Sequence, residues 1–187
     1  MTFNDIRHSS STDSDHFFVD TNVWYWATYI SSKTFLAKRP KDYQVEHYPD
    51  FIESALNNKA TLYYSPLILV ELTNLIERSE WEIYKAYQGD KDIPLKRFRN
   101  IPIERKAVLE EIKTAWASIQ GMANELPAPL GEDLSTPFIS IVESYTVDGY
   151  DALYYHFMKE NGISNIITDD KDFRGLSDIT LYTCYEN

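Results

Sequence analysis

The sequence predicts an α/β fold in which a central parallel sheet of four to five short strands is covered by helices on both faces. Two observations lead to this prediction. Short β-rich runs recur along the 187 residues, and segments with apolar residues at helical spacing separate them. Parallel strands are joined through such helical crossovers, which cover the faces of the sheet.

The predicted elements alternate along the chain. The expected strands span residues 17–19, 62–64, 165–168 and 179–184. The expected helices span residues 23–30, 51–56, 66–78, 104–122, 134–144 and 149–159. Capping chemistry supports two of these helices, because Ser65 and Pro66 suit a helix start, Asp148 suits an N-cap and Gly162 suits a helix end.

The chain is expected to form one domain, residues 16–187, behind a disordered polar tail at residues 1–15. Residues 79–122 interrupt the alternation with helical sequence only, broken near Pro94 and Pro102. We expect this stretch to form a helical arm.

Composition narrows the class of protein. No apolar run approaches a membrane span, and Cys184 is the only cysteine, which predicts a cytoplasmic protein without disulfides or thiolate metal sites. The net charge of −11 argues against nucleic-acid binding over the whole surface. The histidines are scattered and the glycines few, so the sequence contains no zinc motif, phosphate loop or nucleophile elbow. An aspartyl phosphatase is disfavoured because Asn22 stands two residues after Asp20, where a second acid would be expected.

Four acidic residues far apart in the sequence, Asp20, Glu71, Asp151 and Asp170, occupy comparable positions. Asp20 and Asp170 follow predicted strands, where parallel sheets bind ligands. Glu71 lies on the apolar side of its predicted helix, and Asp151 lies in the first turn of its own. Taken singly, Asp20 also fits a helix cap, Asp151 a residue that compensates a helix dipole, and Asp170 a turn residue.

Gathered in one crevice, these carboxylates would repel one another and need a cation or shared protons. Sites built from carboxylate oxygens select hard cations such as Mg²⁺ or Mn²⁺. Such ions suit phosphodiester hydrolysis, because they activate water and neutralise phosphoryl charge.

Basic residues are concentrated in two windows despite the acidic total. Ten of the 18 Lys and Arg residues fall at 33–41 and 91–106. A solvated surface explains such runs, but phosphate contact is the functional alternative, for which the candidates are Lys38, Arg39, Lys96, Arg97 and Arg99. The aromatic residues Trp24, Tyr25, Trp26 and Tyr29 favour core packing over base stacking.

The motifs around the four acids resemble the PIN-domain family of metal-dependent ribonucleases. The likeness is carried by FVDTN at 18–22, SPLILVEL at 65–72, DGYDAL at 148–153 and ITDDKDF at 167–173. It implies a three-layer α/β/α fold, with Mg²⁺ or Mn²⁺ held by the four acids and by Asp172, supported by Asn22 and Thr168. Asp148 is expected to be a cap and Asp169 to face solvent.

By the same resemblance, a water attacks an RNA phosphodiester and leaves a 5′-phosphate and a 3′-hydroxyl. Many small proteins with this pattern are VapC-like toxins silenced by an antitoxin protein, and the arm at 79–122 would add an RNA clamp or a homodimer contact. Two alternatives stay open: a catalytically silent scaffold that binds RNA or protein, and a nuclease specific for structured DNA.

Overall fold

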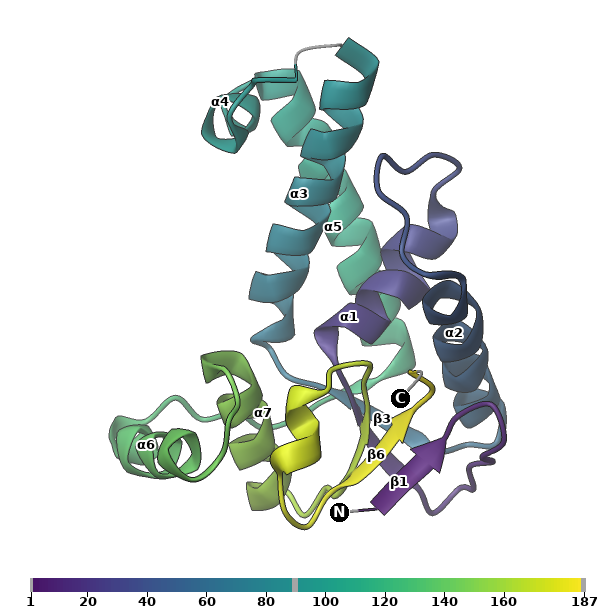
Figure 1. Cartoon of the computed structure of the whole chain (residues 1–187), viewed down its shortest axis with the longest axis vertical. Helices are drawn as coiled ribbons and strands as arrows, with labels where there is room; N and C mark the ends of the chain where they lie inside the picture. The colour runs from purple at the N-terminus through teal and green to yellow at the C-terminus, as the bar shows by residue number, and fades with distance from the viewer. Residues whose placement is uncertain (1, 89–90, 186–187) are drawn as a thin grey trace.

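The computed structural model describes residues 2–88 and 91–185. Within them, six strands form one all-parallel sheet in the order β1-β6-β5-β2-β3-β4 (Figure 1). The strands are β1 Thr2–Asp5, β2 His16–Val19, β3 Thr61–Tyr64, β4 Asn124–Glu125, β5 Asn165–Ile167 and β6 Thr180–Thr183. The α/β class and the parallel sheet are confirmed, and the sheet has more strands than expected.

Helices connect the strands. The α-helices are α1 Thr21–Trp24, α2 Asp42–Asn57, α3 Ile68–Gln88, α4 Leu95–Arg99, α5 Pro102–Met122, α6 Ser135–Ser144 and α7 Gly149–Glu160. A π-helical turn, η1 Tyr25–Tyr29, and the 3-10 turns η2 Ile30–Ser32, η3 Glu132–Leu134 and η4 Asp172–Gly175 complete the chain. None of the helices in the described part of the chain is both long and apolar enough to cross a membrane.

The two edge strands were not expected. The predicted disordered tail is wrong for its first residues, because Thr2–Asp5 pairs in register with Thr180–Thr183. The backbone of β6, which would otherwise be an open sheet edge, supplies hydrogen-bond partners to the polar strand β1. The Ile6 side chain, directly after β1, is buried. Strand β4 was missed because only two residues pair with β3. Residues 1, 89–90 and 186–187, which belong to the predicted tail, arm and domain, lie outside the described residues.

The central strand β2 shows how both faces of the sheet are covered. Phe17 packs edge-on against Phe51 of α2, with ring centroids 5.8 Å apart. The next residue, Phe18, packs against Tyr154 of α7 at 5.2 Å. Because successive strand residues point to opposite faces, α2 and α7 must cover opposite faces, as Figure 1 shows. This is the three-layer arrangement.

Helices α3 and α5 rise side by side beyond the sheet, with α4 at the far end (Figure 1). Buried Glu77 of α3 accepts hydrogen bonds from Arg99 of α4 and from Arg105 of α5, the latter at 3.2 Å. The hydrogen bond from Arg99 lowers the pKa of Glu77, although burial opposes it. A buried charge is tolerated only when it is paired in this way, so these arginines hold the arm together.

A second polar cluster attaches the arm to the segment that follows β2. The Lys33 ammonium lies 2.6 Å from Glu80 Oε1 of α3 and 2.7 Å from Glu111 Oε1 of α5. The Tyr29 hydroxyl donates to the same Glu80 oxygen at 2.8 Å. Lys33, counted among the clustered basic residues of the sequence, therefore bridges three segments of the chain.

Candidate metal centre and adjoining groove

The four acids predicted from the sequence converge on one edge of the sheet. Asp20 directly follows β2, and Asp170 lies three residues beyond β5. Glu71 and Asp151 lie in the first turns of α3 and α7. Because every strand is parallel, the carboxyl ends of β2 and β5 open on the same side, where these two helices begin.

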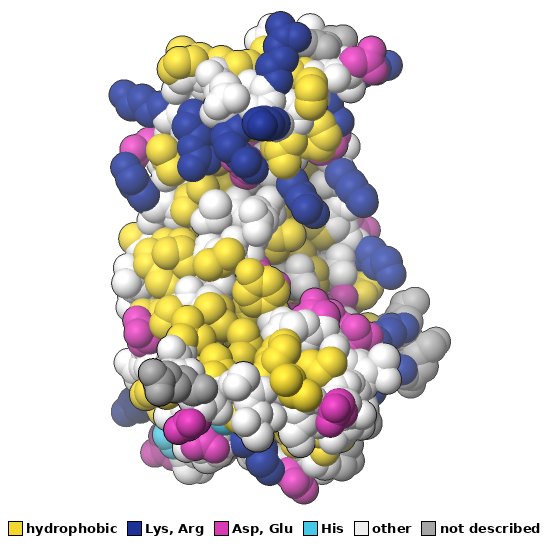
Figure 2. All heavy atoms as spheres, turned by 90° about the vertical axis from the view of Figure 1, so that its left-hand side faces the viewer, with side chains coloured by type: hydrophobic (Ala, Val, Ile, Leu, Met, Phe, Trp, Pro, Cys, Tyr) yellow, Lys and Arg dark blue, Asp and Glu magenta, His cyan; other side chains and the backbone are white. Residues whose placement is uncertain are grey.

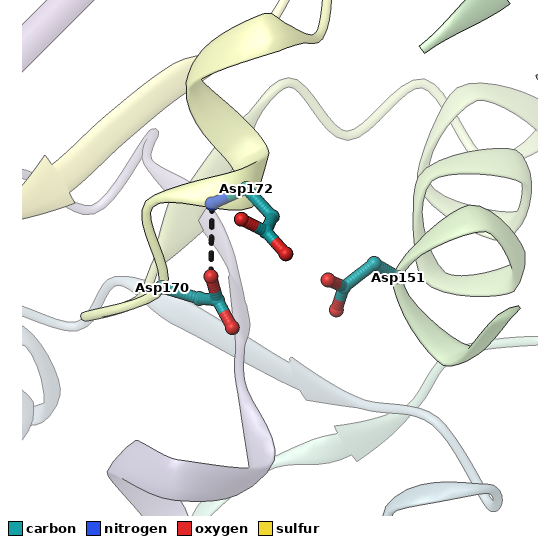
Figure 3. A group of neighbouring side chains, drawn as sticks. All are labelled: Asp151, Asp170 and Asp172. Carbon is teal, nitrogen blue, oxygen red and sulfur yellow. Dashed lines mark hydrogen bonds between the residues drawn. The ribbon is translucent and has the colours of Figure 1, made fainter. Parts of the chain in front are cut away.

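Three carboxylates lie closest together. Asp151, Asp170 and Asp172 each offer an oxygen, and these oxygens lie within 4.8 Å of one another. Figure 3 shows the three side chains pointing toward a common space between α7 and the turn after β5. Asp151 is buried, whereas Asp172 is exposed, so the cluster lies at the mouth of the crevice rather than in the core.

Thr168 links this group to Asp20. Its buried hydroxyl donates to Asp20 Oδ2 at 2.9 Å and accepts from the Asp170 backbone N–H at 2.9 Å. Asp170 Oδ1 in turn accepts from the Asp172 backbone N–H at 2.8 Å. One hydroxyl therefore fixes the relative positions of two candidate ligands, and the supporting role of Thr168 at a metal site stays a prediction.

Glu71 is held by two groups to which the sequence assigned no role. Its Oε2 accepts a hydrogen bond from Thr21 Oγ1 at 2.6 Å and another from the Tyr154 hydroxyl. Thr21 follows Asp20 directly and Tyr154 lies one helical turn after Asp151, but no spacing in the sequence relates either residue to Glu71. Oε1 of Glu71 has no hydrogen-bond partner among the residues described and remains available at the cavity.

Burial and mutual repulsion raise the proton affinity of the cluster. Burial raises the pKa of Asp20 to about 7, with Glu71 and Asp170 adding to the shift and the Thr168 hydrogen bond opposing it. Burial, followed by the charge of Asp20, raises the pKa of Asp151 to about 9. The pKa of Asp170 is also raised, chiefly by burial. Carboxylates in this condition stabilise a bound cation.

The two neighbouring acids have structural roles. Asp148 caps α7 as expected, accepting from the backbone N–H groups of Tyr150 at 2.8 Å and Asp151 at 3.0 Å. The expectation that Asp169 faces solvent is wrong. Its carboxylate is half-buried and accepts from three side chains of α2, those of Tyr43, Gln44 and Tyr48. These donors were not foreseen because α2 begins well before the predicted 51–56.

A groove adjoins the acids. It consists of three cavities of about 330, 380 and 290 Å³ that share lining residues. Asn22 lines the two cavities nearest the acids, one containing Asp169 and Asp170 and the other containing Glu71. Asn22 therefore lies where it could play the predicted supporting role. Its side chain makes no hydrogen bond to the part of the chain described.

The predicted RNA-binding residues fall into two separate groups. Lys38 and Arg39 line the 330 Å³ cavity of the groove. Lys96, Arg97 and Arg99 lie on α4 at the far end of the arm. On the face drawn in Figure 2, Lys and Arg side chains gather over the arm, above a broad band of hydrophobic side chains.

The aromatic residues after Asp20 pack mainly in the core, as expected. Trp24, Trp26 and Tyr29 are buried, and Tyr25 is half-buried with its ring stacked on Tyr29. Tyr25 and Trp26 nevertheless contribute to the wall of the groove.

The donor set fits a hard divalent cation. Three carboxylates lie within reach of one ion, and Asp20 is held beside them by the hydrogen bond through Thr168. Oxygen donors of this kind match Mg²⁺ and Mn²⁺, whereas the one cysteine, Cys184, is buried elsewhere in the fold. The excess proton affinity of Asp20 and Asp151 is the condition that such an ion would relieve.

Comparisons with known proteins concern the family and the fold. The family model described as PIN domain matches residues 17–179. A chain in the crystal structure of VapBC2 from Rickettsia felis bound to a DNA fragment from their promoter superposes with a TM-score of 0.52 at 11% identity, covering 90% of this chain and 98% of that one. PAE2754 from Pyrobaculum aerophilum gives a TM-score of 0.45 at 16% identity, covering 97% and 92%. No curated protein sequence matches the chain.

Proposed function

Because the chain belongs to the PIN domain family, we propose that it is a Mg²⁺- or Mn²⁺-dependent endoribonuclease that hydrolyses RNA phosphodiester bonds. The observation that supports this proposal most strongly is the convergence of Asp151, Asp170 and Asp172 beside buried Asp20. Asp20, Glu71, Asp151 and Asp170 would hold the metal, with Asp172 at the exposed side.

Hydrolysis adds water across a P–O bond and leaves a 5′-phosphate and a 3′-hydroxyl. A bound Mg²⁺ or Mn²⁺ supplies the charge that lowers the pKa of water and offsets the negative phosphoryl group. The protein keeps the acids in position: Thr168 orients Asp20 and the Asp170 backbone, while Thr21 and Tyr154 occupy one oxygen of Glu71. Asn22 lines both cavities at the acids, where it would contact the substrate.

The proposal extends to a biological setting. An antitoxin protein that silences the site and a homodimer are the partners implied by the likeness to VapC-like toxins, and the reducing cytoplasm is the proposed compartment. The exposed carboxylate of Asp172 at the mouth of the crevice supports the antitoxin partner, because it is within reach of a basic peptide.

The test is a side-by-side digestion of single-stranded RNA, transfer RNA and flap DNA with Mg²⁺, with Mn²⁺ and with a chelator. We expect metal-dependent cleavage of RNA by the wild type and none by Asp20→Asn. Cleavage of flap DNA alone would show that the substrate is structured DNA and not RNA. Activity unchanged in Asp20→Asn would contradict the assigned site. Absence of cleavage with every substrate would favour the silent scaffold.

A further inference from the structure

The groove leads away from the acids toward basic residues. Trp26 and Gln44 line both the 330 and the 380 Å³ cavity, and Leu75 and Arg78 line both the 330 and the 290 Å³ cavity. These shared walls make the groove continuous from Asn22, beside the acids, to the segment that carries Lys38 and Arg39. Its opposite wall is α3.

Three exposed cations line the 330 Å³ cavity of this groove, Lys38, Arg39 and Arg78, and within the described residues none of them forms an ion pair. Lys41 and Lys171 line the 380 Å³ cavity. One acid, Glu82, lines the 330 Å³ cavity, and its carboxylate is paired with Lys85 at 2.8 Å. The positive charge of the groove therefore remains available to a ligand.

Three other cations of the same two sequence windows are already neutralised. Lys33 is paired with Glu80 and Glu111, and Arg99 and Arg105 are paired with buried Glu77. Lys96 and Arg97 are exposed, but they lie on α4 and line none of the three cavities of the groove. Ion pairing thus distinguishes cations that hold the fold together from unpaired ones, and position distinguishes the unpaired cations of the groove from those at the end of the arm.

Aromatic side chains also line the groove. Tyr25 and Trp26 line the same cavity as the three free cations. The Tyr25 ring is stacked on Tyr29, with centroids 5.2 Å apart, so its position is fixed before any ligand arrives. Cations that track a phosphate backbone beside aromatic rings are the combination that binds single-stranded nucleic acid.

We propose that a single RNA strand lies along this groove on one side of the bond to be cleaved. Lys38, Arg39 and Arg78 bind its phosphates, and the half-buried Tyr25 ring contacts a base. The basic residues at the end of the arm, Lys96 and Arg97, take no part. The expectation that the strand leads toward the acids rests on the proposed nuclease function. The inference itself concerns RNA binding and not cleavage.

The test measures binding of a short, fluorescently labelled single-stranded RNA in an Asp170→Asn background, which prevents cleavage. The triple variant K38A/R39A/R78A is compared with the charge-matched K96A/R97A/K106A, whose three exposed residues lie on the arm. Fluorescence anisotropy gives Kd at several salt concentrations, and thermal unfolding checks that both variants are folded.

We expect the groove variant to reduce the slope of log K against log salt by about 2, since each phosphate contact on a single strand contributes about 0.7. The corresponding loss at about 0.15 M salt is roughly 50-fold in Kd. The arm variant should bind within about twofold of the parent and keep its slope.

The inference is overturned if the groove variant binds as tightly as the parent, if the arm variant loses as much, or if the parent does not bind the RNA. Failure of the proposed function is a different result. A protein that binds RNA through the groove but never cleaves it would contradict the nuclease assignment and leave the groove assignment standing.

Discussion

Replacing Asp151 by Asn is expected to slow RNA cleavage severely while raising the melting temperature of the metal-free protein. Burial and the neighbouring acids raise the pKa of Asp151 to about 9, so its charged form is disfavoured in the fold. A neutral amide of the same shape removes that cost, which we place at about 2 kcal/mol or more because one pKa unit corresponds to about 1.4 kcal/mol. For a chain of this length, 2 kcal/mol shifts Tm by roughly 4–8 °C.

The same substitution removes a candidate metal ligand, so the cleavage rate should fall roughly 10³-fold. Thermal unfolding at pH 8 with a chelator and a single-turnover cleavage assay provide the two readouts. Asp148→Asn is the matched control, because it lies in the same turn and Asn keeps the N-cap. Lower stability of the metal-free Asp151→Asn protein would show that the Asp151 carboxylate is not destabilised by burial and its acidic neighbours. Normal RNA cleavage would show that it is not a metal ligand.

Without metal, the protein should lose stability as the pH rises from about 4 to about 9. The folded-state pKa is about 7 for Asp20 and about 9 for Asp151, against an ordinary value of 3.8. The folded protein therefore holds more protons than the unfolded chain within this window. Stability falls with pH when the folded state binds more protons, so the contribution is complete below about pH 4 and is lost by about pH 9.

Metal should remove this dependence. Millimolar Mn²⁺ binds the ionised cluster of the folded protein only, so it should raise Tm most at high pH. Asp5 and Glu77, whose pKa values are lowered, change stability in the opposite direction but only below their ordinary values. Melting curves from pH 5 to 9, with a chelator and with Mn²⁺, measure the effect; a metal-free Tm that rises across this range would contradict it.

The convergence of the four candidate acids could be predicted from the sequence because their positions follow from local patterns. Asp20 and Asp170 follow apolar strand runs, and parallel strands place such residues at one edge of the sheet. Glu71 was noticed because a charge occupied the apolar side of a helix, and its two hydroxyl donors explain how the fold tolerates it. The donors themselves, Thr21 and Tyr154, could not be assigned, because their partner is distant in the sequence.

Features that depend on long-range pairing were predicted poorly. Strand β1 looked like a disordered tail because its stability comes from the edge of β6, nearly the whole chain away. Asp169 looked solvent-facing because its partners belong to α2, whose first turns carry polar residues and whose interior contains Pro49.

The basic windows illustrate the same limit. Sequence placed Lys38, Arg39, Lys96, Arg97 and Arg99 together by their charge, and spacing alone cannot distinguish a free cation from a paired one. The structure pairs Arg99 with Glu77 and places Lys38 and Arg39 on the groove. Arg78, which lies outside both windows, lines the same groove and was missed because it stands alone in the sequence.

Calorimetric titration of Mn²⁺ into the wild type and into the double variant Asp20→Asn with Asp170→Asn tests the metal centre most directly, since it needs no substrate. We expect binding by the wild type, with protons released at neutral pH as the raised pKa values require, and no binding by the double variant. A wild-type protein that takes up no Mn²⁺ or Mg²⁺, or a double variant that binds as well as the wild type, would contradict the metal centre.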